Sequence, residues 1–111
     1  MLGHYDLLVC PTLSCTAVLN REDGDTKGPA EVAGEPVDPL IGWCPTYLFN
    51  FTGHPAASAP CGFDARGLPV GLQLVGRRWA DADVIAASAT FERLRPWAGS
   101  YRVPAVRPLP A

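Results

Sequence analysis

The sequence predicts an α/β protein, in detail an α+β fragment with three strands and one well-defined helix. Short apolar segments with strand character run from Tyr5 to Pro11, Ala56 to Phe63 and Pro69 to Val75, and turn-forming residues bound each of them. One segment, Asp81 to Arg95, has clear helical spacing. A sheet of three strands with one helix is open on one face and unpaired at its edges, so we expect self-association through exposed sheet edges.

The first strand is short and is followed by a long loop. The run YDLLVCP at residues 5–11 is apolar, contains a β-branched residue and ends in proline, which is too brief for a stable helix. From Ser14 to Pro39 the sequence is polar and rich in small residues, with no helical or strand period. We therefore expect a long surface loop over residues 14–39.

Two short helical pieces are expected after this loop. Asp38 can accept a backbone N–H at a helix start, and Pro39 suits the first helical position. Pro45 interrupts, so the pieces are predicted around Leu40 to Trp43 and Pro45 to Phe51. Gly53 is placed to end the second piece.

The strand candidates at residues 56–63 and 69–75 are joined by the turn-forming tetrapeptide Asp64 to Gly67, which predicts an antiparallel hairpin. Pro60 removes a ladder donor, so it should lie at a bulge or beside an unpaired edge. In the helix that follows, Asp81 is the expected cap and Pro96 the stop. The domain segment then spans residues 1–95, with an extended proline-rich tail at 96–111.

Composition excludes several classes of protein. A chain of 111 residues, 48% hydrophobic and 18% charged, has the size and composition of one globular domain. The net charge of -2 gives no electrostatic reason to expect nucleic acid or an anionic membrane as a partner. No apolar run approaches the roughly 20 residues that span a bilayer, and the N-terminal sequence lacks a basic n-region. We therefore expect a cytoplasmic location and no membrane.

The titratable and nucleophilic residues do not form a catalytic set. Lys27, the only lysine, lies in a solvated loop and is a poor general base. His54 lies in a turn, where a structural role is favoured. The Ser58 hydroxyl, between small apolar residues, is expected to bond backbone rather than attack a substrate. We therefore predict no catalytic residue from these patterns.

The remaining candidates for chemistry are cysteines and acidic residues. The four cysteines are scattered without a C-x-x-C pair, which favours buried free thiols over a disulfide or zinc set. Cys61 has no cationic neighbour in sequence and should be inert. Glu22, Asp23 and Asp25 indicate a solvated face rather than a metal site. We expect no metal and no cofactor.

Two motifs resemble the C-terminal part of the amidase signature family. That family carries N-x-x-G-x-P-x-x-S-x-P-x-G, then G-L-P-x-G-x-Q, then a helix; the matching stretches here are NFTGHPAASAPCGF at 50–63 and GLPVGLQLVG at 67–76. The leading strand, with Asp6, Pro11 and Thr12, is similar to the family's D-x-x-x-x-P-T element. The segment from Trp79 to Leu94 is similar to its closing helix, so the resemblance extends over most of the chain.

The resemblance implies a part of the mixed β-sheet of an amidase, flanked by helices. The family hydrolyses amides with a Ser-cis-Ser-Lys triad that lies upstream of the matched region, so no catalytic residue transfers to this sequence. The implied partners are a small amide substrate and the upstream part of the same chain, without which this segment should be inactive. The motif's glycines and prolines then serve close packing. Its polar residues would chiefly satisfy buried backbone groups: Asn50, Ser58 and Gln73.

Three aromatic residues precede the motif, and the resemblance implies that this region lines part of the substrate pocket. Our hypothesis is that Trp43, Tyr47 and Phe49 bind the acyl side of the substrate, together with the long loop. The alternative is that they are ordinary core residues. Two alternative functions also stay open. One is a subunit of a glutamine-dependent amidotransferase, which the net charge does not favour, and the other is a non-catalytic binding module.

Overall fold

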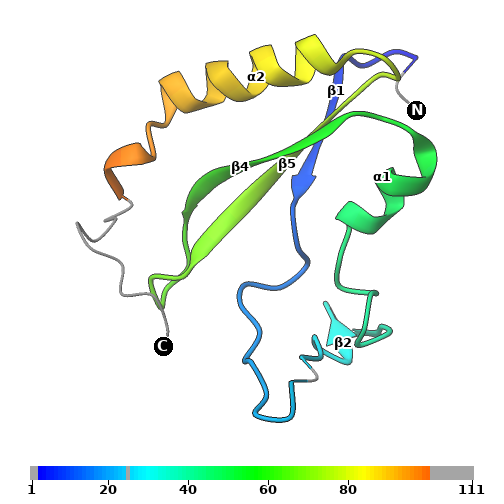
Figure 1. Ribbon diagram of the computed structural model, residues 1–111, viewed down its shortest axis with the longest axis vertical. Helices are drawn as coiled ribbons and strands as arrows, with labels where there is room; N and C mark the ends of the chain where they lie inside the picture. The colour runs from blue at the N-terminus through cyan, green and yellow to red at the C-terminus, as the bar shows by residue number, and fades with distance from the viewer. Residues whose placement is uncertain (1–2, 25, 101–111) are drawn as a thin grey trace, which may run out of the picture.

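The computed structural model describes residues 3–24 and 26–100 and has the α/β architecture that the sequence predicts (Figure 1). Its strands and helices follow the predicted order of strand, loop, short helix, β-hairpin and helix. In chain order they are β1 (Leu7–Pro11), β2 (Glu31–Val32), β3 (Glu35–Pro36), α1 (Thr46–Thr52), β4 (Ala56–Phe63), β5 (Pro69–Gly76), α2 (Asp81–Leu94) and the 3-10 turn η1 (Ala98–Ser100).

The main sheet is antiparallel with strand order β1-β5-β4, so β5 is central. Its register places Gln73 of β5 between Cys10 of β1 and Ser58 of β4. The partners of Leu74 are Val9 and Ala57. Since side chains alternate across a strand, these two rows point to opposite faces of the sheet.

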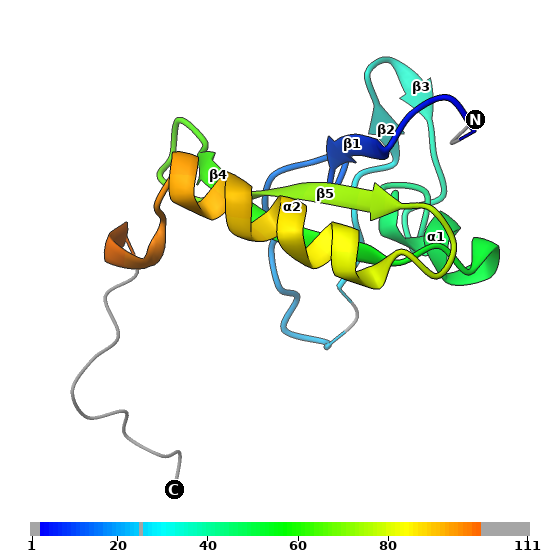
Figure 2. The same cartoon turned by 90° about the horizontal axis from the view of Figure 1, so that it is seen from above.

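Helix α2 covers one face of the hairpin, while α1 and the β2–β3 hairpin lie on the other side (Figures 1 and 2). The sheet face that carries Leu74 and its partner Ala57 is the one that faces α2. Ala57 and Ala59 of this face line a hollow together with Ile85 and Ser88 of the helix. Gly76 of the same face meets Val84 of α2. The row of Ser58 and Gln73 therefore points away from α2.

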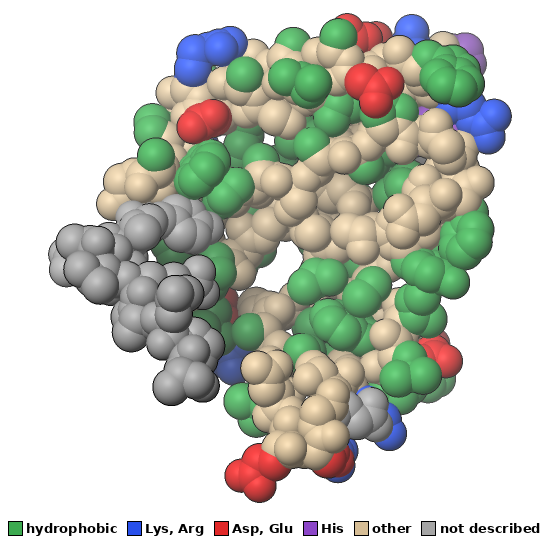
Figure 3. All heavy atoms as spheres, in the orientation of Figure 1, with side chains coloured by type: hydrophobic (Ala, Val, Ile, Leu, Met, Phe, Trp, Pro, Cys, Tyr) green, Lys and Arg blue, Asp and Glu red, His purple; other side chains and the backbone are tan. Residues whose placement is uncertain are grey.

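The core is small. Among the described residues, the buried apolar side chains are Ala59, Leu74, Val75 and Val84. Many large apolar side chains are exposed, among them Phe51, Phe63 and Trp79. Figure 3 shows hydrophobic side chains across one face and a hollow between the part that carries α2 and the part that carries the loop. A small buried set beside many exposed large apolar side chains fits a segment that packs against something further, and self-association through the sheet edges stays a prediction.

The hairpin matches its prediction in strands, turn and bulge. Its register shifts between Pro60 and Gly62, which confirms a bulge at this proline. In the turn, the Asp64 carboxylate accepts hydrogen bonds from the backbone N–H groups of Leu68 at 2.8 Å and Arg66 at 2.9 Å. The bond from Leu68, followed by the interactions with Arg66, lowers the pKa of Asp64. The sequence and the local hydrogen bonds therefore favour the same turn.

The expected helical piece at Leu40–Trp43 is wrong, because these residues form turns. The N–H of Leu40 donates to Asp38 Oδ1 at 2.7 Å, as a capped start requires, and the N–H of Gly42 donates to the Asp38 carbonyl at 2.8 Å. One turn forms and does not continue, since Pro45 lacks the N–H that the next turn would need. Helix α1 starts afresh after Pro45 and ends at Gly53, whose φ of 68° confirms the predicted left-handed end.

Helix α2 begins at the predicted residue and ends one residue before the predicted end, but it lacks the predicted cap. Ala80 occupies the N-cap position, and no side chain caps the helix. Asp81 and Asp83 lie in the first turn, where their charges interact favourably with the helix dipole. The expectation that the Asp81 side chain caps the helix is therefore wrong.

The predicted loop at 14–39 contains the β2–β3 hairpin, which the sequence does not predict. Ala33 and Gly34 at its turn have φ values of 53° and 86°, the combination that a tight hairpin turn requires. In the predicted tail, Ala98–Ser100 forms η1, and residues 101–111 lie outside the described residues. The division into 1–95 and 96–111 stays a prediction. No helix in the described ranges is long and apolar enough to cross a bilayer.

Candidate functional site

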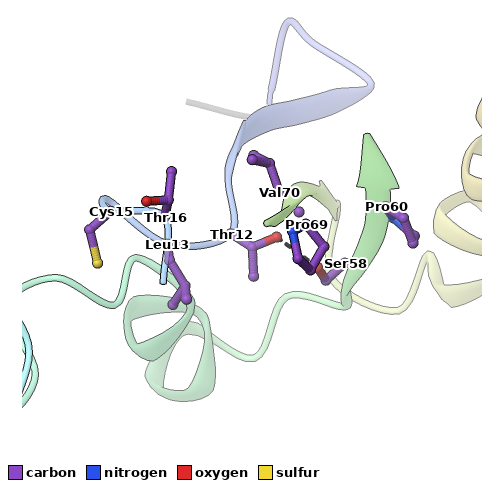
Figure 4. A pocket seen from close by; sticks show the side chains of 9 residues that line it. Thr12, Leu13, Cys15, Thr16, Ser58, Pro60, Pro69 and Val70 are labelled. Carbon is purple, nitrogen blue, oxygen red and sulfur yellow. Dashed lines mark hydrogen bonds between the residues drawn. The ribbon is translucent and has the colours of Figure 1, made fainter. Parts of the chain in front are cut away.

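The polar side chains of the motif gather on the sheet face that points away from α2. Ser58 Oγ and Thr12 Oγ1 lie 2.6 Å apart in a hydrogen bond that joins β4 to the residue after β1 (Figure 4). Next to them, Gln73 is 2% exposed and its Nε2 donates to Cys10 Sγ at 3.4 Å. A row of hydrogen-bonding groups therefore crosses all three strands.

Gly71 makes room for the hydroxyl pair. A Cβ at this position would lie 2.6 Å from Thr12 Oγ1 and 2.9 Å from Ser58 Oγ, closer than real Cβ contacts allow. The Gly71 carbonyl also accepts the N–H of Thr12 at 2.9 Å. The glycine inside G-L-P-V-G thus permits two side chains to meet over a strand, as the packing interpretation of the motif predicts.

The expected role of the motif's polar residues needs a correction. The expectation is that they chiefly satisfy buried backbone groups, but Ser58 is exposed and bonds the Thr12 hydroxyl, while Gln73 bonds a thiol. Asn50 is exposed on α1. Side-chain partners from neighbouring segments satisfy Ser58 and Gln73, because the register of the three strands brings those partners alongside.

Two open pockets meet at Ser58. The first has a volume of about 280 Å³ and is lined by Thr12, Leu13, Cys15, Thr16, Ser58, Pro60, Pro69, Val70 and Gly71 (Figure 4). The second has a volume of about 290 Å³ and is lined by Thr46, Phe49, Asn50, His54, Ala56, Ala57, Ser58 and Gln73. Both combine apolar walls with a few hydrogen-bonding groups, as pockets for small molecules do.

The structure does not bring the three predicted substrate-binding aromatics together. Phe49 lines the second pocket beside Ser58 and Gln73. Tyr47, two positions earlier on α1, lies in a different hollow and packs edge-on against Phe51 with ring centroids 4.8 Å apart. Trp43 is half-buried, and its Nε1 donates to the Pro39 carbonyl at 3.0 Å. Phe49 therefore shares the second pocket with Ser58 and Gln73, whereas Tyr47 and Trp43 line neither of these two pockets.

The pockets offer binding groups rather than an activated nucleophile. The Ser58 and Thr12 hydroxyls bond each other, and within the described residues no hydrogen bond joins either of them to a basic side chain. A hydroxyl without an adjacent base is a weak nucleophile. Lys27 lies in the loop at 14–39, outside both sets of lining residues, and His54 contributes to the second pocket only. Sequence reasoning missed Thr12 as a partner of Ser58, since no local pattern links residues so far apart.

The four cysteines are free thiols, as predicted, but each is half-buried rather than buried. Cys10 accepts the hydrogen bond from Gln73, and the Cys61 thiol donates to the Val70 carbonyl at 3.4 Å. Within the described ranges, no three histidine, cysteine or acidic side chains cluster as metal ligands would.

Comparison with known proteins gives a consistent result. A family model described as amidase matches residues 1–85. An acylamidase of Rhodococcus erythropolis is 39% identical over 98 residues, which are 87% of this chain and 20% of that protein. A glutamyl-tRNA(Gln) amidotransferase subunit of Thermosynechococcus vestitus is 34% identical, over 85% of this chain and 18% of the relative. Fatty acid amide hydrolase of Arabidopsis thaliana is 36% identical, over 82% of this chain and 14% of that protein.

A solved structure is similar over nearly the whole chain. It is a bacterial aryl acylamidase described as belonging to the amidase signature enzymes, and the match has 56% sequence identity and a TM-score of 0.87. The match covers 97% of this chain and 22% of that chain. This chain therefore spans about a fifth of the length of the proteins it matches.

Proposed function

The chain belongs to the amidase signature family, and from this premise we propose that it is the C-terminal portion of an enzyme that hydrolyses a carboxylic amide to an acid and an amine or ammonia. One observation carries the proposal. The acylamidase relative aligns with 87% of this chain but only a fifth of its own length, so most of such an enzyme has no counterpart in these 111 residues. The exposed apolar side chains fit a segment that packs against such a remainder.

Within that enzyme, this segment supplies structure and one side of the substrate site rather than the reacting groups. The row Thr12, Ser58 and Gln73 presents hydrogen-bonding groups, and no base lies in contact with its hydroxyls within the described ranges. The nucleophile and its base then come from the remainder of the protein, as the family's Ser-cis-Ser-Lys triad implies. The 111-residue chain alone is expected to be inactive.

We propose an aryl acylamide as the substrate class. Support comes from the 56% identity to an aryl acylamidase, which exceeds the 34% identity to the amidotransferase relative. An amidotransferase subunit is the second candidate, and several relatives of that name support it. The amidotransferase relatives are named for a tRNA, whereas the net charge of -2 of this chain does not favour contact with RNA. The non-catalytic binding module remains the third candidate, through the unpaired edges of β1 and β4.

The pocket proposal now centres on Phe49. Its ring lines the second pocket beside the polar row, which suits an apolar acyl or aryl group held next to hydrogen-bonding groups. Tyr47 lines a separate hollow on α1, and Trp43 holds the loop through its bond to the Pro39 carbonyl, so in this proposal both residues act indirectly, by supporting the segment that carries Phe49.

The activity test compares two polypeptides. The natural protein that carries this sequence is identified by immunodetection and peptide mapping, and then purified and assayed with a chromogenic acyl anilide beside the 111-residue chain. We expect a longer natural protein that releases the aryl amine, and no turnover by the short chain. A natural product of only this length, or a long one that acts only as a glutamine-dependent amidotransferase, would contradict the hydrolase proposal.

The same assay tests the pocket. Phe49→Ala in the active protein should lower kcat/KM by roughly tenfold or more, with the loss varying with acyl size, because one apolar contact is worth about 1–3 kcal/mol in discrimination. Leu94→Ala is the control, since Leu94 is 74% exposed on α2 and lines neither of the two pockets. If Phe49→Ala lowered kcat/KM by the same factor for every acyl size, or did not lower it at all, this ring would only pack.

A further inference from the structure

Two of the four cysteines lie where distant segments of the chain meet. The backbone N–H of Ser14 donates to the Trp43 carbonyl at 2.9 Å, which brings the segment after β1 against the segment before α1. Cys15 and Cys44 are the next residues in each segment, and both thiols are half-buried. The contact therefore places a pair of partly accessible thiols at the two ends of the long loop.

These two thiols differ from the other two. The sulfurs of Cys10 and Cys61 have hydrogen-bond partners in Gln73 and Val70. In the described part of the chain, no hydrogen bond engages the sulfur of Cys15 or Cys44. Figure 4 shows the Cys15 sulfur directed away from the Thr12 and Ser58 hydroxyls, which leaves it outside the hydrogen-bonded row.

The electrostatic surroundings of Cys15 also indicate that Cys44 is nearby. Burial raises the pKa of Cys15, and so does the negative charge of the neighbouring Cys44 thiolate. The second effect places the two thiols within electrostatic reach of each other, which agrees with the backbone contact between Ser14 and Trp43. Adjacent backbone segments suit a disulfide, because its Cα atoms lie about 4.4–6.8 Å apart.

We propose that Cys15 and Cys44 form a redox-modification site that closes to an intramolecular disulfide by exchange with a small disulfide such as oxidised glutathione. One protein thiolate attacks a sulfur of glutathione disulfide, forms a mixed disulfide and releases one glutathione thiolate. The second protein thiolate attacks the protein sulfur of that mixed disulfide and releases the other glutathione. Two protein thiols lose two electrons, glutathione disulfide gains them, and the two thiol protons pass to the released glutathione thiolates.

Cys44 is the expected first attacker, because burial raises the pKa of Cys15 and so lowers the fraction of that thiol present as thiolate. Closure would tie one wall of the first pocket, which Cys15 and Leu13 line, to the start of α1. It would also close the loop at 14–39 covalently. A cross-link over a loop of this length lowers the conformational entropy of the unfolded chain more than that of the folded chain, which stabilises the fold.

Disulfide mapping tests the proposal directly. The purified 111-residue chain is equilibrated with oxidised and reduced glutathione, once in native buffer and once in guanidinium, then alkylated, digested and analysed by mass spectrometry. In guanidinium the pair should hold a share of about one in six or less, since four cysteines offer six possible pairs and loop closure favours shorter separations such as Cys10–Cys15. In native buffer we expect Cys15–Cys44 to be the majority disulfide. The midpoint temperature of thermal unfolding should then rise by several degrees, and it should fall back when the disulfide is reduced.

Four variants and a second protein complete the test. Cys15→Ser and Cys44→Ser should each abolish the native disulfide, while Cys10→Ser and Cys61→Ser should retain it. The longer natural polypeptide should give the same linked peptide under the same conditions. Equal pairing in native buffer and guanidinium, a majority pair that includes Cys10 or Cys61, or glutathione adducts without an internal disulfide would overturn the proposal. None of these readouts depends on amide hydrolysis.

Discussion

Replacing Leu74 by alanine is expected to lower the free energy of unfolding by about 2–5 kcal/mol, the range for leucine removed from a packed core. Leu74 is 5% exposed, lies on the central strand β5 and has Val9 and Ala57 as cross-strand partners. Its side chain faces α2, so the cavity would open at the contact between sheet and helix. A domain of this size holds about 5–15 kcal/mol in total, and the small buried set offers little to fill the space.

Urea unfolding monitored by circular dichroism measures this effect through the transition midpoint. Leu19→Ala serves as the matched control, since Leu19 is 89% exposed in the loop and its loss should change stability by no more than about 0.5 kcal/mol. If Leu74→Ala shifted the midpoint no further than Leu19→Ala, the sheet–helix contact would not be the core of this chain.

Gly76→Ala is expected to cost about 1–3 kcal/mol, as overpacking does in a filled interior. A Cβ at this position would lie 2.6 Å from Val84 Cγ2, 3.4 Å from the Ala80 carbonyl oxygen and 3.5 Å from Pro55 Cγ. Val84 is 3% exposed and β-branched, so it has few rotamers with which to retreat. The helix would have to move away from β5.

A double-mutant cycle isolates this contact. In a Val84→Ala background the methyl group that Gly76→Ala meets is gone, so the substitution should cost measurably less than in the native chain. Gly99→Ala is the control, because a Cβ on Gly99 would meet nothing within 4 Å. Equal costs of Gly76→Ala in the two backgrounds would mean that backbone strain, and not the helix contact, explains the glycine.

Features that depend on neighbouring residues were predicted well. The hairpin, its turn at Asp64 to Gly67 and the bulge at Pro60 follow from turn residues and a missing N–H within a few positions. The extent of α2 follows from apolar spacing. Two of the errors share a cause, because the piece at Leu40–Trp43 and the cap at Asp81 required choosing between local arrangements of similar energy. The surrounding fold made that choice.

The sequence by itself determined the segments of β1, β4, β5 and α2 and, through two long motifs, the family. Only the tertiary structure decided which side chains meet. The Thr12–Ser58 hydroxyl pair, the Gln73–Cys10 bond and the backbone bond from Ser14 to Trp43 join residues far apart in the chain. The tertiary structure also places Trp43, Tyr47 and Phe49 in different surroundings, although they lie close together in sequence. The physical reason is that periodicity and turn propensity act over a few residues, whereas such contacts depend on strand register and on the path of a long loop, which packing of the whole chain establishes.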